Sequence, residues 1–290
     1  MNRTLSLIGY PCGKGAQITE CEKGPEKLKD WGLSDKLNHR NIDSIWHDGF
    51  KLDNSLDDLQ YVKTACNSLY KQVIDSIDNG NFPVTIGGDH SMAIGTWSAI
   101  ADKYSIKNNL GLIWIDAHLD AHTPDSSQSG AIHGMPAASL LGYGSKELVN
   151  LGSEGAKINP EHLVYIGIRS YEEEEYQLIK DLGITVFTIY DVIKYGMENI
   201  IQDTISIVTE NTNGFGLTVD LDAFDPTRAP GVGSPEKIGL LRNEVFLALK
   251  NIGNHKKIKA LEIAEYNPDE GYDDITKNLV LDLISSIFSK

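Results

Sequence analysis

The stretch LGLIWIDAHLDAH, residues 110–122, joins an uninterrupted apolar run to acidic and imidazole side chains at every second position from Asp116 to His122. An apolar run bounded by polar residues indicates a strand that is buried on both faces, as in a parallel sheet covered by helices. Such a strand ends at the carboxyl edge of the sheet, where α/β proteins place their active sites. This stretch therefore predicts a fold class and the location of a site.

Similar short runs recur along the chain, with helical segments between them. The predicted strands are residues 5–9, 41–46, 83–87, 110–116, 162–168, 184–189, 215–220 and 258–263. This alternation predicts an α/β fold with a mostly parallel sheet of eight strands. Strand counting leaves two architectures open, an open sheet between layers of helices and a closed (β/α)₈ barrel.

Apolar residues at helical spacing predict several of the intervening helices. One covers residues 56–77, with Ser55 and Asp58 in a capping-box pattern at its start. The same spacing predicts helices at 242–252 and 275–288.

The composition limits the classes of partner. No linker or repeat divides the sequence, so residues 1–290 are expected to form a single domain. The net charge of −15 argues against nucleic acid and against an anionic membrane surface as partners. The three cysteines, Cys12, Cys21 and Cys66, form no CxxC pair, so no thiolate zinc site is predicted. Without a signal peptide or a long apolar run, we expect a cytoplasmic protein.

The polar side chains after the strand at 110–116 are candidate metal ligands. In an extended chain alternate side chains face the same way, so Asp116, His118 and Asp120 would converge if the strand continued beyond Ile115. One imidazole between two carboxylates suits a divalent cation. The alternative is a polar loop whose side chains are solvated.

Two further strand ends carry the same types of residue. In VDLDAFDP, Asp220 and Asp222 repeat the i, i+2 spacing, and burying two unpaired carboxylates side by side would be costly without a cation. In GGDHS, Asp89 and His90 follow a predicted tight turn. Each motif alone is also compatible with a solvated turn or a structural histidine.

Together the three strand ends supply six candidate ligands, which are His90, Asp116, His118, Asp120, Asp220 and Asp222. Six ligands exceed the need of one structural zinc ion and suit two metal ions that share bridging carboxylates. Four carboxylates with two imidazoles favour Mn²⁺ over Zn²⁺. Because a pair of metal ions lowers the pKa of a bridging water, the pattern predicts a hydrolase.

Several motifs follow one another along the chain, in the order GGDHS, DAHLDAHTP, SGAIHGMP, VDLDAFDPTRAPGVGSP and LEIAEYNP. In this series the sequence resembles the ureohydrolase family, and the likeness extends over almost the whole chain from GPEKLK at 24–29. The resemblance implies a three-layer αβα fold with an open, mostly parallel eight-stranded sheet. It also implies two Mn²⁺ ions per subunit on the six candidate ligands, a small guanidino substrate and a trimeric or hexameric homo-oligomer. The implied reaction is attack of a metal-bridging hydroxide on the guanidinium carbon.

The resemblance further implies roles for individual residues. His133, in IHGMP, matches a histidine that passes a proton to the leaving amine. Glu265, in AEYNP, matches the acid that holds the guanidinium, for which a carboxylate is the natural bidentate partner. Ser234, in GVGSP, takes the place of a hydroxyl residue near the metals. The predicted catalytic residues are His133, Glu265 and the candidate metal ligand Asp120.

The residues that would contact the amino-acid end of the substrate depart from the family pattern. Asn is usual at the positions of His122 and Ala131, and only His122 still carries a hydrogen-bond donor. Ser129 is retained. Glu172 stands where an Asp for the α-amino group is usual, and its alternative reading is a solvated acid that favours the helix dipole.

The resemblance leaves several functions open. HGMP at 133–136 favours the arginase branch, whose reaction converts L-arginine and water to L-ornithine and urea. The alternatives are an agmatinase, a formimidoylglutamase or another guanidino-acid hydrolase and, from a different class, a metal-binding subunit without turnover. The predicted substrate-binding residues are His122, Ser129, Glu172, Ser234 and Glu265.

Overall fold

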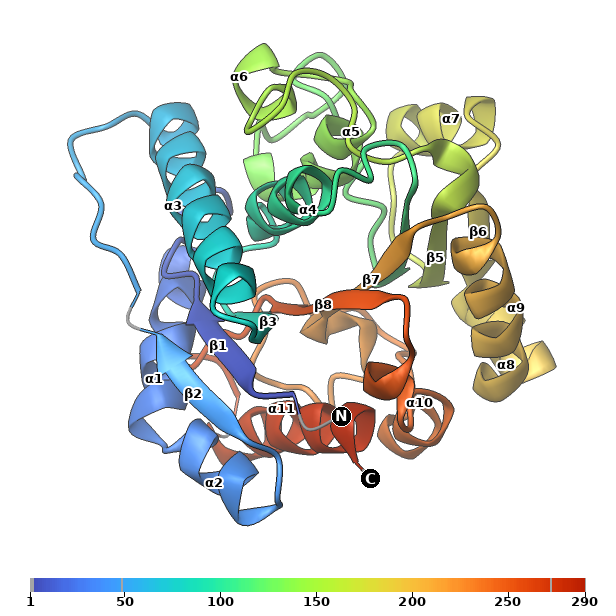
Figure 1. Cartoon of the computed structure of the whole chain (residues 1–290). Coiled ribbons are helices and arrows are strands. Elements are labelled where there is room, and N and C mark those ends of the chain that lie inside the picture. The colour runs from blue at the N-terminus through green and yellow to red at the C-terminus, as the bar shows by residue number, and fades with distance from the viewer. Residues whose placement is uncertain (1–2, 48, 272, 290) are drawn as a thin grey trace.

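The computed structural model describes residues 3–47, 49–271 and 273–289 and places all eight predicted strands in one sheet (Figure 1). The strands are β1 (Leu5–Gly9), β2 (Ser44–His47), β3 (Phe82–Ile86), β4 (Leu110–Ile115), β5 (Leu163–Ile168), β6 (Thr185–Thr188), β7 (Gly214–Asp220) and β8 (Ile258–Ala264). Neighbours pair in parallel throughout the order β2-β1-β3-β8-β7-β4-β5-β6. The parallel sheet is confirmed, and it is open, with β2 and β6 at its edges. The barrel architecture is therefore wrong.

Helices cover both faces of the sheet, which explains why the strands are apolar throughout (Figure 1). They are α1 (Gly24–Asp30), α2 (Leu33–His39), α3 (Asp58–Asp78), α4 (Met92–Lys103), α5 (Pro136–Leu140), α6 (Lys146–Val149), α7 (Glu173–Asp181), α8 (Ile189–Tyr195), α9 (Met197–Thr209), α10 (Arg242–Ala248) and α11 (Asp273–Phe288). On β4, Leu112 and Trp114 join a core with α3 and α4, whereas Ile113 and Ile115 join one with α9 and α11. The predicted three-layer αβα fold is confirmed. No helix in the described ranges is long and apolar enough to cross a membrane.

The start of α3 differs from the prediction. Its N-cap is Asp57, whose carboxylate accepts a hydrogen bond from the Gln60 amide at 2.9 Å. The predicted capping by Ser55 and Asp58 is wrong because Asp57, with extended backbone angles, is the residue that meets the free amides of the first turn.

The two predicted C-terminal helices are both present, with different bounds. Helix α10 ends at Ala248 rather than at residue 252, because Asn251 adopts a left-handed backbone conformation with φ of 63°. Helix α11 begins at Asp273 and ends at Phe288, close to the predicted 275–288.

The centre of the sheet determines where the site lies. Strands β3, β8, β7 and β4 are consecutive neighbours, so their carboxyl ends lie side by side. Glu265 and Asp116 directly follow β8 and β4, Asp220 is the last residue of β7, and His90 lies four residues after the end of β3. Four separate parts of the sequence therefore deliver their polar side chains to one place.

Candidate metal centre and substrate pocket

The chain turns sharply after β4. The strand ends at Ile115, and one oxygen of Asp116 (Oδ1) accepts a hydrogen bond from the His118 amide at 2.7 Å. Asp120 adopts a φ of 51°, which an extended strand does not allow. The expectation that the strand continues beyond Ile115 is therefore wrong. A carboxylate-capped turn brings Asp116 and His118 to the same side instead.

A carboxylate also caps the turn that follows β7. The Oδ1 atom of Asp220 accepts a hydrogen bond from the Asp222 amide at 2.8 Å, and this contact caps the short 3₁₀ turn Leu221–Ala223. In both motifs one carboxylate oxygen is used by the local turn. The other oxygen, Oδ2, of Asp116 and of Asp220 lies 3.1 Å from His90 Nδ1, and that of Asp116 also accepts a hydrogen bond from the Trp114 indole at 2.8 Å.

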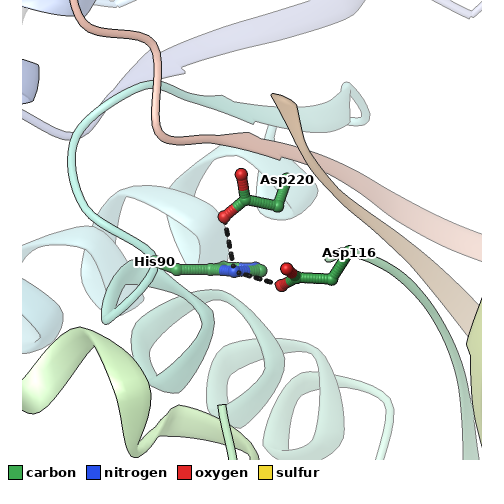
Figure 2. Close-up of side chains that lie close together, drawn as sticks. All are labelled: His90, Asp116 and Asp220. Carbon is green, nitrogen blue, oxygen red and sulfur yellow. Dashed lines mark ion pairs between the residues drawn. The ribbon is translucent and has the colours of Figure 1, made fainter. Parts of the chain in front are cut away.

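His90 lies at the middle of this cluster (Figure 2). Its Nδ1 atom is 3.1 Å from Asp116 Oδ2, 2.9 Å from Asp120 Oδ2 and 3.1 Å from Asp220 Oδ2. The four side chains come from three strand ends, and His90 and Asp116 are almost completely buried.

His118 extends the cluster toward the surface. Its Nδ1 atom is 3.0 Å from Asp222 Oδ2 and 3.6 Å from Asp116 Oδ1. Asp116 thus belongs to two overlapping groups, one with His90 and Asp220 and one with His118 and Asp222. The structure brings all six predicted metal ligands together, because the sixth, Asp120, contacts His90.

The electrostatics of the cluster favour added positive charge. Burial and repulsion from Asp222 and Asp116 raise the pKa of Asp220 well above its ordinary value. Burial likewise raises the pKa of Asp222 to about 6, although nearby His118 opposes the shift. Burial opposes a charge on His90, yet the surrounding carboxylates raise its pKa well above the usual value. A dication would relieve the mutual repulsion of these groups.

The donor set fits a binuclear metal site. His90 Nδ1 is buried and makes no hydrogen bond within the described part of the chain, although three carboxylate oxygens lie close to it. An imidazole lone pair that faces carboxylates is a metal-ligand arrangement, because these groups repel one another unless a cation or proton lies between them. The sharing of Asp116 by two groups provides a bridging ligand for two ions.

Glu265 and His133 form a pair beside the cluster. Glu265 follows β8 with a φ of 65°, a conformation that few residues other than glycine adopt. Its Oε1 atom accepts a hydrogen bond from the His90 amide at 2.8 Å and lies 3.0 Å from His133 Nδ1. Burial opposes a charge on His133, but the contact with Glu265 raises its pKa to about 9. His133 therefore carries a proton near neutral pH.

A pocket with a volume of about 300 Å³ opens above these groups. Its walls include the predicted residues His122, Ser129, Glu172, Ser234 and Glu265, so the structure brings the whole predicted substrate-binding set to one cavity. Cavities that bind small molecules have volumes from about 300 to 1,000 Å³, so the space suits a compact substrate.

The outer end of the pocket contains a histidine–carboxylate hydrogen bond that the sequence did not reveal. His122 Nε2 lies 2.9 Å from Glu172 Oε2, and Glu175 Oε1 is 3.7 Å from the same nitrogen. Glu172 is also the N-cap of α7, where it forms a capping box with Glu175, and it lines the pocket. Ala131 lines the same cavity without a polar group.

Glu175 is a pocket residue that sequence reasoning missed. It is buried, and its Oε2 atom accepts a hydrogen bond from the Ala121 amide at 3.1 Å. Burial raises the pKa of Glu175 to about 7. Glu175 lies three residues after Glu172, which is the capping-box spacing, and this spacing could have indicated from the sequence that the two side chains lie together.

The fold and the site together define a three-layer α/β protein with a candidate binuclear metal centre at the carboxyl edge of its sheet. Comparison with known families specifies this class further. The chain belongs to the arginase family, because the model of that family matches residues 3–289.

Individual relatives agree with this assignment. The arginase of Bacillus caldovelox is 35% identical, and the alignment covers 99% of each chain. The crystal structure of arginase from Bacillus subtilis superimposes with a TM-score of 0.92 at 34% identity, again over 99% of each chain. The structure of Entamoeba histolytica arginase in complex with L-ornithine matches with a TM-score of 0.88 at 29% identity, over the full length of both chains. The resemblance to the ureohydrolases is thereby confirmed.

Proposed function

We propose that this protein is a manganese-dependent arginase, which hydrolyses L-arginine to L-ornithine and urea. The observation that carries the proposal is the convergence of six metal-capable side chains with the Glu265–His133 pair at one pocket. The similarity to arginases over the whole chain, one of them bound to L-ornithine, supports the same reaction.

The proposed cofactor is a pair of Mn²⁺ ions. Four carboxylates and two imidazoles form an oxygen-rich donor set, which suits Mn²⁺ better than the thiolate-rich sets typical of structural Zn²⁺. His90, Asp116, Asp120 and Asp220 would hold one ion, and Asp116, His118 and Asp222 would hold the other. When bound, the two ions supply hydroxide from water near neutral pH and stabilise negative charge in the transition state.

Glu265 is proposed to bind the guanidinium group. A guanidinium binds a carboxylate through paired N–H donors, and Glu265 is a buried carboxylate at the wall of the pocket. The hydrogen bond from the His90 amide fixes the Glu265 carboxylate. Glu265 would therefore hold the substrate's reacting carbon in a fixed position beside the metal centre.

His133 is proposed to give a proton to the departing amine. Its pKa of about 9 keeps the imidazole protonated at neutral pH, and it lines the same pocket as Glu265. His133→Ala is expected to lower kcat by about 10²-fold because a positioned acid is lost. The same variant should keep both metal ions, since His133 is not among their proposed ligands. Steady-state urea release and metal content together test this prediction, and a near-normal kcat would refute the role.

The amino-acid end of the substrate is proposed to lie beside Glu172, His122 and Ser129. The Glu172 carboxylate suits an α-ammonium group, and Ser129 offers a hydroxyl to the α-carboxylate. The His122 imidazole replaces an amide and could still donate a hydrogen bond to the α-carboxylate. Assembly into a trimer or hexamer stays a prediction from the family resemblance, and a cytoplasmic location stays a prediction from the sequence.

The experiment that tests the proposed function compares three substrates. Purified protein loaded with Mn²⁺ is incubated with L-arginine, agmatine and formiminoglutamate, and urea or formamide release is measured. We expect urea from L-arginine at a rate well above that from agmatine, because agmatine lacks the α-carboxylate. Greater turnover of agmatine or formiminoglutamate would retain the metal chemistry and refute the substrate. No product from any of the three would support the alternative of a subunit without turnover.

A further inference from the structure

A buried carboxylate behind the metal centre has no part in the proposed reaction. Glu262, on β8, is fully buried, yet it lies on the far side of His90 from the pocket. Its Oε1 atom accepts a hydrogen bond from the Thr218 hydroxyl at 2.9 Å and one from the Trp97 indole at 3.2 Å. Thr85 contacts the second oxygen at 3.4 Å. A carboxyl group buried in the core needs such partners, and here they connect it to His90.

Thr218 connects Glu262 to His90. The Thr218 hydroxyl oxygen lies 3.0 Å from His90 Nε2. Because the one hydroxyl hydrogen of Thr218 is directed to Glu262, the oxygen of Thr218 can only accept a hydrogen bond from the imidazole. Nε2 of His90 therefore carries hydrogen, and Nδ1, which faces the three aspartates, is the nitrogen left for a metal ion.

We propose that Glu262, acting through Thr218, is a positioning residue that fixes the tautomer and orientation of His90 for metal binding. The proposal rests on the proposed metal site. Glu262 is 3.9 Å from His90 Nε2, which is too long for a direct hydrogen bond, so the hydroxyl is a necessary link. Carboxylates that accept a hydrogen bond from a ligating imidazole increase its basicity and hold the ring in place.

Among the residues that the structure describes, no equivalent relay reaches His118, which provides an internal comparison. Its outer nitrogen, Nε2, is 3.9 Å from Glu236 Oε1, with no hydrogen bond between them. The Glu236 side chain is 39% exposed, whereas that of Glu262 is fully buried. Removal of the Glu262 relay should consequently affect the metal ion bound by His90 more than the one bound by His118.

The test measures the dissociation constants of both Mn²⁺ ions by isothermal titration calorimetry. Thr218→Val removes the hydroxyl at nearly constant volume. It should lower the affinity for the ion bound by His90 by about 10- to 100-fold, with little change in the affinity for the other ion. Thr218→Ser keeps the hydroxyl and should restore affinity to near that of the unmodified protein. Thr212→Val is the matched control, because the buried Thr212 hydroxyl donates to the Val208 carbonyl and contacts neither Glu262 nor His90.

A second pair of variants covers the case in which Thr218→Val does not fold. Glu262→Leu removes the carboxyl group that accepts the Thr218 hydrogen bond and lets the Thr218 hydroxyl donate to His90 instead. It should therefore lower the affinity for the same Mn²⁺ ion by about 10-fold or more. Glu236→Leu should leave both affinities within about threefold of the unmodified protein. Unchanged binding of both ions in folded Thr218→Val or Glu262→Leu protein would overturn the proposal. Failure of the unmodified protein to bind Mn²⁺ would instead contradict the proposed function.

Discussion

Asp116→Ala is expected to lower kcat/KM for L-arginine by about 10³-fold or more and to leave fewer than two Mn²⁺ ions per chain. Asp116 belongs to both overlapping groups of candidate ligands, with one oxygen 3.1 Å from His90 and the other 3.6 Å from His118. Loss of the shared carboxylate should therefore disturb both ions. A metal ion contributes several kcal/mol of transition-state stabilisation, which corresponds to a rate effect of this size.

Two further variants make this prediction specific. His118→Ala affects only the second group and should remove one ion, again with loss of most turnover. Asp225→Ala is the control, since Asp225 lies in the same VDLDAFDP motif but contacts Thr227 rather than the cluster. Metal content by mass spectrometry and urea release are measured on each protein. Two ions and a near-normal rate in Asp116→Ala would refute the ligand assignment.

Glu265→Gln is expected to reduce kcat/KM by about 10²- to 10³-fold while both metal ions stay bound. The amide would still accept a hydrogen bond but would carry no charge for the guanidinium, and the loss of a buried charge pair costs about 2–5 kcal/mol. Glu265 is not a member of the two candidate metal groups, so metal content should not change.

The comparison that isolates this effect is Glu174→Gln. Glu174 is an exposed acid at the start of α7, and its charge should not affect the substrate. Saturation curves with L-arginine separate KM from kcat, and metal analysis shows that the centre is intact. An unchanged kcat/KM in Glu265→Gln would mean that another group holds the guanidinium.

The fold could be predicted from the sequence because its strands are unusually easy to recognise. Burial on both faces requires runs such as LGLIWI, and the structure places the alternate side chains of β4 in two different cores. The candidate ligands could be predicted because they immediately follow such runs. The contacts among them could not, since the turns made by Asp116 and Asp220 depend on backbone hydrogen bonds that spacing does not specify.

The residues that were missed share a physical reason. Glu262 reads as an ordinary member of the strand run KALEIA, and its partners Trp97 and Thr218 come from other elements. Likewise, the pairing of His122 with Glu172 joins positions 50 residues apart. Local patterns predict elements and strand ends, but side-chain contacts between elements need the packed fold.

The position of the metal ions is the most direct test of the binuclear centre. Crystals grown with Mn²⁺ would be measured on both sides of the manganese absorption edge, and an anomalous difference map would be calculated. The binuclear centre predicts two peaks in each chain, one beside His90 and one beside His118, with Asp116 between them. A single peak, or none at these side chains, would contradict the binuclear centre on which the proposed hydrolysis depends.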